Sequence, residues 1–351
     1  MIGYMGAALM TNHVPVETAH KLVYAEVHRL PENIQRHLVG LDSNSVDPTE
    51  HASQRARAEH VDIFAQFLPW FAIRPLYNQL LFLTSRILGL TRSAVLLALF
   101  PYFLLSLLVF RWTCRYIRPE FAASFSLLLM LTVPIAGVGR TPVSDALSVL
   151  IATIVLYLLF ERDQTAVGIT LLLASIFART DNVALAMPVL AVLWLTKRIS
   201  FLQASILGVI AVSSVLFISR MAGDFGLQML YYRNFVAIPV APGEVVVHFS
   251  LAQYLRAFRA GLAAMLQGWL VPFLLLASIG LFRGSRLRVL SGIAVVYVAL
   301  HFLILPNWME RWFVVAYIPM ALSAVCVAGN HYEMLYKSVF QGLPRPQSPT
   351  P

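Results

Sequence analysis

The stretch VGRTPVSDALSVL, residues 138–150, has two opposite charges, Arg140 and Asp145, at the start of a long apolar run. A second stretch, FARTDNVALAMPVL, repeats the arrangement with Arg179 and Asp181. A charged side chain beside hydrocarbon is costly, so charges that open the most apolar segments of a chain need a physical explanation. Both stretches predict helix ends at a membrane surface.

The composition indicates an integral membrane protein. Of the 351 residues, 59% are hydrophobic and 12% are charged, and the mean hydropathy is +0.73. A soluble domain has about 25% charged residues. The net charge of +9 is typical of basic residues that flank membrane spans, so we expect no nucleic-acid partner. The two cysteines give no disulfide framework.

Apolar runs joined by short loops predict an all-α polytopic membrane protein with about nine spans between residues 91 and 330. Two of the runs are short, and they either extend through the ARTDN turn or lie where the membrane is thin or water-filled. The candidate spans are 93–110, 121–138, 142–160, 166–178, 183–195, 201–219, 262–282, 289–305 and 311–328.

The N-terminal part of the chain differs from the rest. Residues 1–10 are apolar but too few for a span, which needs about 20 residues, so we interpret them as the remnant of a first span or as a re-entrant start. Residues 11–90 are polar and predict a loop that contains amphipathic helices, the last of them interfacial. Residues 331–351 form a tail.

Loop charge predicts the orientation of this multi-pass chain. The Arg- and Lys-rich loops and the tail are expected on the cytoplasmic side, in the plasma (inner) membrane of a bacterium or in the endoplasmic reticulum of a eukaryote. The polar loop 11–90 and the charged turns at Arg140, Arg179 and Arg311 then share the opposite, extracytoplasmic side. A shared side suggests a shared site.

The three arginines suit an anionic ligand, because a guanidinium grips phosphate or carboxylate with two parallel hydrogen bonds. The alternative is that each arginine pairs with a near neighbour: Arg140 with Asp145, Arg179 with Asp181, and Arg311 with Glu310 or a lipid headgroup. The aspartates have an ordinary explanation as well. Thr141 or Ser144 could cap the helix that follows, and an acid in the first turn complements the helix dipole.

Glu17 and His20 share one helical face near the start of the polar loop. Glu17 could accept a proton from an acceptor hydroxyl or help to hold a divalent metal; the alternative is an ordinary acid in the first turn of a helix. The histidines of the loop make no zinc pattern, and the chain has no Walker loop, GxGxxG or GxSxG motif.

The order of these features resembles the membrane glycosyltransferases of the GT-C fold, in particular the protein mannosyltransferase and lipid A aminoarabinose transferase type. The stretch RPLYNQLLFLTSRILGL, residues 74–90, is similar to the interfacial helix of that family. The turn GRTPVSDAL and the late stretch ERWFVVAYIPMAL, residues 310–322, follow in the family's order. The family has two prolines where this chain has one, and its acid stands beside a second acid, which is absent at Glu17.

The resemblance implies a GT-C-like helical bundle and transfer of a sugar from a polyprenyl-phosphate donor to an acceptor hydroxyl on a lipid, glycan or protein. It implies Glu17 as the general base, with a divalent metal as an optional cofactor. It implies that Arg140, Arg311 and Arg179 hold the donor phosphate. Supporting roles fall to His20, Arg74, Tyr77, Asp145 and Glu310.

Two other functions stay open. The short runs 166–178 and 183–195 could be the broken helices of a lipid or solute transporter or flippase, although His301 is the one ionisable residue well inside a predicted span. The short apolar start is also compatible with a non-catalytic protein on a degenerate transferase scaffold.

Overall fold

The computed structural model describes residues 1–41, 48–223, 232, 236, 238–245, 248–282, 287–306 and 309–340, with side chains up to residue 329. Helices and turns account for this part of the chain, and it contains no β-strand. Predictions that fall on the gaps or on residues 341–351, the last part of the predicted tail, lie outside the described residues.

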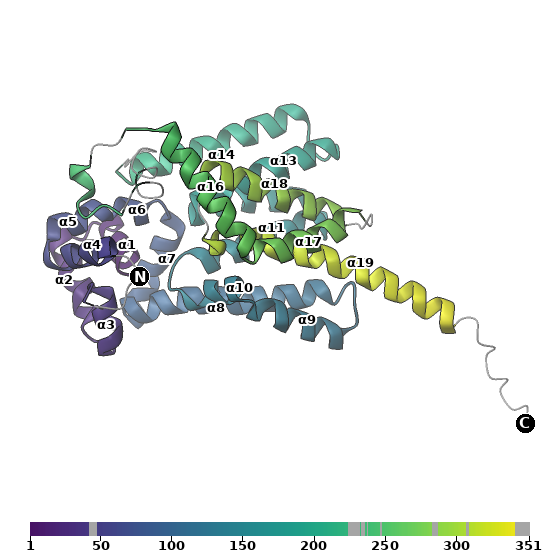
Figure 1. The fold of residues 1–351 in the computed structure, drawn as a ribbon, viewed down its shortest axis with the longest axis horizontal. Helices are drawn as coiled ribbons and strands as arrows, with labels where there is room; N and C mark the ends of the chain where they lie inside the picture. Colours follow the sequence, from purple (N-terminus) through teal and green to yellow (C-terminus); the bar gives the residue numbers. More distant parts are fainter. Residues whose placement is uncertain are drawn as a thin grey trace, which may run out of the picture.

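The N-terminal helices form a polar head at one end of a bundle of apolar helices (Figure 1). Helix α1 lies at the centre of the head, with most of its side chains buried against α2, α6 and α7. The head helices are α1 (Ile2–Thr11), α2 (Val16–Val27), α3 (Glu32–Leu38), α4 (Pro48–Glu59), α5 (Val61–Phe67) and α6 (Pro69–Ala72).

The head differs from the sequence prediction in one respect. The sequence TEHASQRARAEHVDIFAQFL, residues 49–68, predicts a single helix, but the chain breaks at His60, whose backbone is extended (φ −122°, ψ 116°). Pro69 then starts the short helix α6, because proline fits the first turn of a helix and not its interior. The break lets α5 and α6 turn back over α2 and α1.

The predicted interfacial helix is present as α7 (Pro75–Leu88). Pro75 occupies its first turn, and Gly89 ends it with a positive φ of 81°, which costs glycine little. Helix α7 packs against both α1 and α8 and therefore joins the head to the bundle.

Helices α8 to α19 form the bundle, in which α11 packs against α8 and α12, and α19 against α17 and α18. Its elements are α8 (Leu90–Thr113), α9 (Pro119–Leu131), α10 (Val133–Arg140), α11 (Asp145–Phe160), α12 (Thr165–Ala178), η1 (Thr180–Asn182), α13 (Val183–Leu195), α14 (Phe201–Met221), α16 (Leu251–Gln267), α17 (Leu270–Phe282), α18 (Arg288–Ile304), η3 (Glu310–Trp312) and α19 (Val314–Phe340). The short η2 (Pro242–Glu244) packs against α5 of the head.

Two described helices, α8 and α14, are long and apolar enough to cross a membrane by length and composition, and up to four spans result if two bent pairs each count as one. Helices α9 and α10 meet at 70°, and α16 and α17 meet at 73°, so the runs 121–138 and 262–282 are not the straight helices that were expected. Pro134 cannot continue α9, and the extended backbone of Gly268 ends α16.

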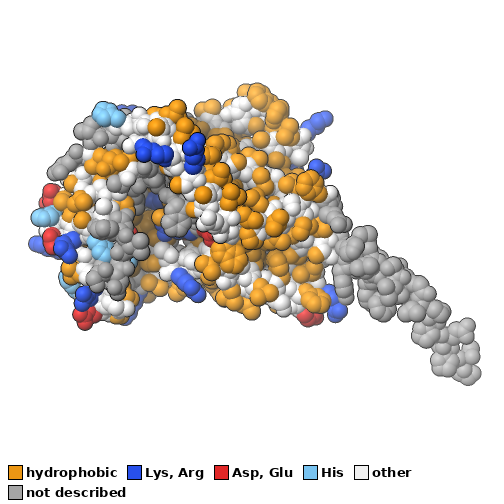
Figure 2. Space-filling view, viewed as in Figure 1, with side chains coloured by type: hydrophobic (Ala, Val, Ile, Leu, Met, Phe, Trp, Pro, Cys, Tyr) orange, Lys and Arg blue, Asp and Glu red, His pale blue; other side chains and the backbone are white. Residues whose placement is uncertain are grey.

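The surface of the bundle is largely apolar. Only 11% of the most apolar window of α14 is buried inside the molecule, and its Leu216 and Phe217 are exposed. Figure 2 shows hydrophobic side chains over this face of the bundle, with Lys and Arg near the head and at the opposite end. Exposed apolar surface of this extent marks a contact with lipid or with another protein.

A buried carboxylate ties the bundle together at the end away from the head. Glu161, just after α11, accepts hydrogen bonds from Trp112 Nε1 at 3.2 Å, from Arg115 Nη1 at 2.8 Å and from the hydroxyl of Tyr116. The three donors lie at the end of α8 and in the turn that follows it. The carboxylate therefore fixes the last turn of α8 against the end of α11.

We expect Glu161→Ala to lower the free energy of unfolding by about 3 kcal/mol, because it leaves buried donors without an acceptor. Chemical unfolding of the detergent-solubilised protein measures the change. Glu120→Ala, whose carboxylate is exposed, should change the value by less than about 1 kcal/mol. Equal losses in the two variants would contradict the assignment of Glu161 as a buried tie.

Candidate functional site: a charge cluster between head and bundle

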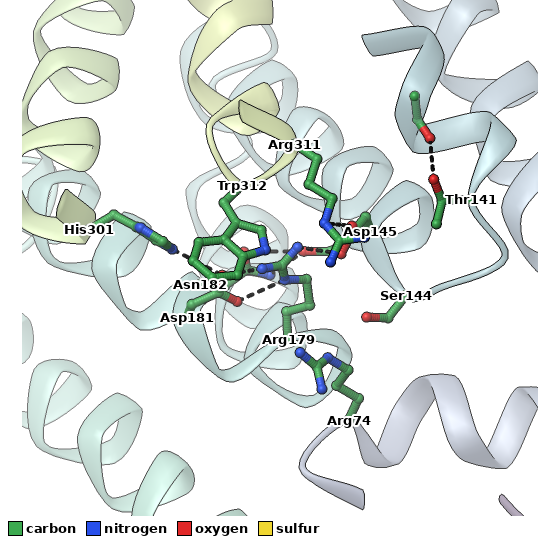
Figure 3. Close-up of polar contacts among 12 residues, drawn as sticks. Arg74, Thr141, Ser144, Asp145, Arg179, Asp181, Asn182, His301, Arg311 and Trp312 are labelled. Atoms are coloured by element: carbon green, nitrogen blue, oxygen red, sulfur yellow. Dashed lines mark hydrogen bonds and ion pairs between the residues drawn. The ribbon is translucent and has the colours of Figure 1, made fainter. Parts of the chain in front are cut away.

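Arg179 is the centre of a buried charge cluster (Figure 3). It follows α12 with an extended backbone (φ −153°, ψ 125°), which turns its side chain away from the helix axis. Its Nε donates to Asp181 Oδ1 at 2.9 Å and its Nη2 to Asp181 Oδ2 at 2.5 Å. Its Nη1 donates to Asp145 Oδ1. The two charged turns of the sequence therefore meet in one cluster.

Of the two alternatives for Arg179, the structure shows the pair with Asp181. Burial alone would raise the pKa of the Asp181 carboxyl, but Arg179 and the hydrogen bond from His301 outweigh burial and hold this pKa well below its usual range. Asp181 is therefore ionised at neutral pH. Arg179 has carboxylate partners at all three of its nitrogens, so in this conformation it organises the cluster.

Asp145 does more than start its helix. It is the first residue of α11, as the dipole argument expects, but it reaches Arg179 on a different pair of helices. The expected side-chain cap is absent: Ser144 is the N-cap residue and its hydroxyl lies 3.3 Å from the hydroxyl of Tyr4, while Thr141 donates back to Gly137. The charge of Asp145 is held by tertiary contacts, because a buried carboxylate needs a cation.

Arg311 approaches the same carboxylate from η3. Its Nε lies 3.6 Å from Asp145 Oδ2, and both atoms are buried without a hydrogen-bond partner among the described residues. The rest of the Arg311 side chain is 38% exposed. The expected pair of Arg311 with Glu310 is not formed, because Glu310 Oε1 accepts from the backbone nitrogen of Trp269, where α16 gives way to α17. Arg311 is therefore incompletely neutralised.

Arg74 lies beside the cluster, at the start of α7 (Figure 3). Its Nη1 donates to the carbonyl of Trp70 at 2.7 Å, its guanidinium lies 5.4 Å from the ring centre of Tyr4, and Figure 3 shows it pointing toward Arg179. Tyr77, one turn further along α7, packs edge-on against Tyr4 at 5.0 Å, and its buried hydroxyl has no hydrogen-bond partner among the described residues. Residues of α1 and α7 therefore form the head side of the site.

Arg140 does not pair with Asp145 in the described structure. It is exposed at the end of α10, and α10 contacts η3, the turn that carries Arg311. Arg140 therefore lies next to the cluster and outside its buried part.

Glu17 and His20 are not part of the cluster. Glu17 is exposed in the first turn of α2, and it has no hydrogen-bond or ion-pair partner among the described residues. His20 Nε2 lies 3.1 Å from the carbonyl of Arg57, and its ring packs against Tyr24 and Phe64 inside the head. Both residues lie on α2 in the head, outside the charge cluster.

Two members of the site have no role in the sequence prediction. His301, in the last turn of α18, places Nε2 3.2 Å from Asp181 Oδ2. Asn182 donates to Ser148 at 2.9 Å and to the carbonyl of Ser175 at 2.9 Å, which fixes the turn that carries Arg179. The sequence marks His301 as unusual, because it is the one ionisable residue well inside a predicted span. It does not predict the partner, Asp181, which lies 120 residues earlier in the chain.

The site can attract an anion. Arg179 and Arg311 balance the carboxylates of Asp145 and Asp181. Arg74, which Figure 3 draws near Arg179 without an ion pair to either carboxylate, adds a positive charge beside this balanced cluster. Among the described residues, no three His, Cys, Asp or Glu side chains lie close enough together to hold a metal ion. The cluster is therefore suited to bind a phosphate or carboxylate through arginines.

Comparisons with protein-family models, with curated protein sequences and with solved structures find no match to this chain.

Proposed function

We propose that the protein is a membrane glycosyltransferase of the GT-C type that transfers a sugar from a polyprenyl-phosphate donor to an acceptor hydroxyl of a lipid, glycan or protein. The bundle is multi-pass, with its far end and the C-terminus on the cytoplasmic side and the head on the opposite side. In a bacterium the membrane is the plasma membrane. The proposal gives donor-phosphate binding to Arg311, Arg140 and Arg74, and gives Arg179 the task of positioning Asp145.

One observation carries the proposal. Arg311 Nε is buried without a hydrogen bond and lies 3.6 Å from a carboxylate oxygen that is also unsatisfied. A buried polar group without a partner is costly, and a ligand oxygen that accepts from Arg311 would remove part of this cost. The cluster lies in the bundle beside Arg74, which begins α7, the helix that packs on both the head and the bundle (Figure 3). A lipid phosphate occupies the same depth when its chain is in hydrocarbon.

We expect Arg311→Ala to weaken binding of polyprenyl phosphate by about tenfold to a hundredfold, because it removes a charge-assisted contact worth roughly 1.5–3 kcal/mol. Arg140→Ala should have a smaller effect, since Arg140 is exposed. Native mass spectrometry of the protein in lipid nanodiscs measures both affinities. Arg118→Ala, an exposed arginine just before α9, is the control and should bind as wild type. Unchanged affinity in both the Arg311 and the Arg140 variant would overturn the phosphate site.

The function itself is tested by transfer in membranes. Membranes that contain the protein are incubated with a panel of polyprenyl-phosphate sugars, and labelled sugar on lipid, glycan and protein acceptors is measured. We expect transfer from one donor of the panel. Absence of transfer from every donor would overturn the transferase assignment, even where polyprenyl phosphate binds.

One observation favours a second candidate, a non-catalytic lipid-binding protein on the same scaffold. Glu17, the acid that the resemblance gives to catalysis, is exposed and stands apart from the arginine cluster. A protein that binds polyprenyl phosphate through Arg311 but transfers no sugar would support this candidate.

A further inference from the structure

The head contains a cavity of about 190 Å³ that lies between α1, α4 and the start of α6. This volume is far above the roughly 30 Å³ that one water occupies in the liquid and below the roughly 300 Å³ of the smallest drug-sized pockets. The cavity therefore has room for one small ring. Its apolar wall is aromatic and consists of Tyr24, Phe67, Trp70 and Phe71.

The opposite wall, from α4, is polar and incompletely satisfied. Ser53 is fully buried, and its hydroxyl has no hydrogen-bond partner among the described residues. The buried Oε1 of Gln54 is also without a partner, while its Nε2 lies 3.4 Å from Glu50. Arg57 uses its Nε to bond the carbonyl of Ser53 at 3.0 Å and rests 4.6 Å from the ring centre of Phe67. Buried polar atoms normally have partners, so the Ser53 hydroxyl and the Gln54 carbonyl can form hydrogen bonds with a ligand in the cavity.

The cavity adjoins the charge cluster through its own walls. Trp70 presents its carbonyl to Arg74, and Phe71 packs on Tyr4, whose hydroxyl lies 3.3 Å from Ser144. Met1, Ile2 and Gly3, at the start of α1, also line the cavity. A ligand in the cavity is thus separated from the cluster by the first turn of α1.

We propose that this cavity binds a single pyranose ring, with the aromatic wall against its C–H face and Ser53 and Gln54 on its hydroxyl groups. A sugar ring has one apolar and several hydroxylated edges, which match the two walls. The Ser53 hydroxyl can donate to or accept from a ring hydroxyl, and the Gln54 carbonyl accepts from one. This site rests on the proposed function for the source of the ring. The ring is the sugar of either the polyprenyl-phosphate donor or the acceptor.

Saturation-transfer NMR on the full-length protein in nanodiscs tests the site, with methyl mannopyranoside, methyl glucopyranoside and methyl 4-amino-arabinopyranoside as probes. We expect one probe to bind and Ser53→Leu, which fills the cavity, to weaken it at least tenfold. Ala52→Leu, on the exposed face of the same helix, is the matched control and should bind as wild type. Gln54→Met keeps the shape of the side chain and removes the amide, and it should weaken binding severalfold. This variant keeps the proposal testable if Ser53→Leu does not fold.

The proposal is overturned if no probe binds wild type, which would leave a water-filled cavity, or if Ser53→Leu and Gln54→Met both bind as wild type does. Competition identifies the source of the ring. Displacement of the probe by a polyprenyl-phosphate sugar, but not by bare polyprenyl phosphate, assigns the donor's sugar; no displacement by either assigns the acceptor's. One further result separates the two proposals. If the probe binds but bare polyprenyl phosphate does not bind at all, the cavity is a sugar site and the proposed transferase function is wrong.

Discussion

Replacing Arg179 with methionine is expected to lower the free energy of unfolding by about 3–5 kcal/mol. The substitution keeps an unbranched side chain of similar length but leaves Asp145 and Asp181 without their main cation in a buried cluster. Removing one partner of a buried ion pair costs this much because an uncompensated charge stays in a medium of low polarity. The same variant should loosen the contact between α11 and the turn after α12.

Chemical unfolding in detergent measures this loss, and Arg29→Met is the control. Arg29 pairs with Glu26 at the surface of the head, where its side chain is 76% exposed, so its loss should cost less than about 1 kcal/mol. A triple variant with Arg179→Met, Asp145→Asn and Asp181→Asn should recover part of the stability, since no buried charge is left unpaired. A single variant as stable as wild type would show that the cluster does not hold the two helix pairs together.

The low pKa of Asp181 sets the pH range of this contribution. A carboxyl whose pKa is lower in the folded than in the unfolded protein stabilises the fold above the unfolded value of about 4 and loses that contribution as pH falls below it. The part of the stability that depends on Asp181 should therefore be constant from pH 5 to 8 and decrease progressively below about pH 4.

If Glu17 is the general base that the resemblance implies, Glu17→Gln is expected to lower the transfer rate at least a hundredfold and to leave the affinity for polyprenyl phosphate unchanged. A positioned general base contributes about 10²–10⁴ to a rate, and glutamine has the shape of glutamate without its basicity. Donor binding should be unaffected because Glu17 has no partner among the described residues and stands apart from Arg311. Transfer is measured in membranes and affinity in nanodiscs.

Glu32→Gln is the matched control for this experiment. Glu32 is also an exposed acid in the first turn of a head helix that follows a proline, so its loss should leave transfer unchanged. Equal transfer rates for wild type and Glu17→Gln would remove Glu17 as the base while leaving the donor site intact. Absence of transfer in wild type would instead favour the non-catalytic candidate.

Sequence patterns anticipated most of the bundle. Hydrophobic runs located α8, α12, α13, α14 and α18 to within a few residues at each end, because apolar length is a local property of the chain. The bends at Pro134 and Gly268 were missed. A proline or glycine in an apolar run is tolerated in many membrane helices, so the run alone does not say whether the helix continues.

The sequence by itself determined an all-α protein with apolar helices, a polar N-terminal region and charges at the ends of neighbouring helices, since these follow from composition and periodicity. Only the tertiary structure decided how those charges pair. Asp145 could have bonded Arg140, five residues before it, yet it binds Arg179 and approaches Arg311. Arg140 ends one helix and Asp145 begins the next, with a turn between them. The partner of a buried charge is chosen by the packing of helices far apart in the chain, which no local pattern records.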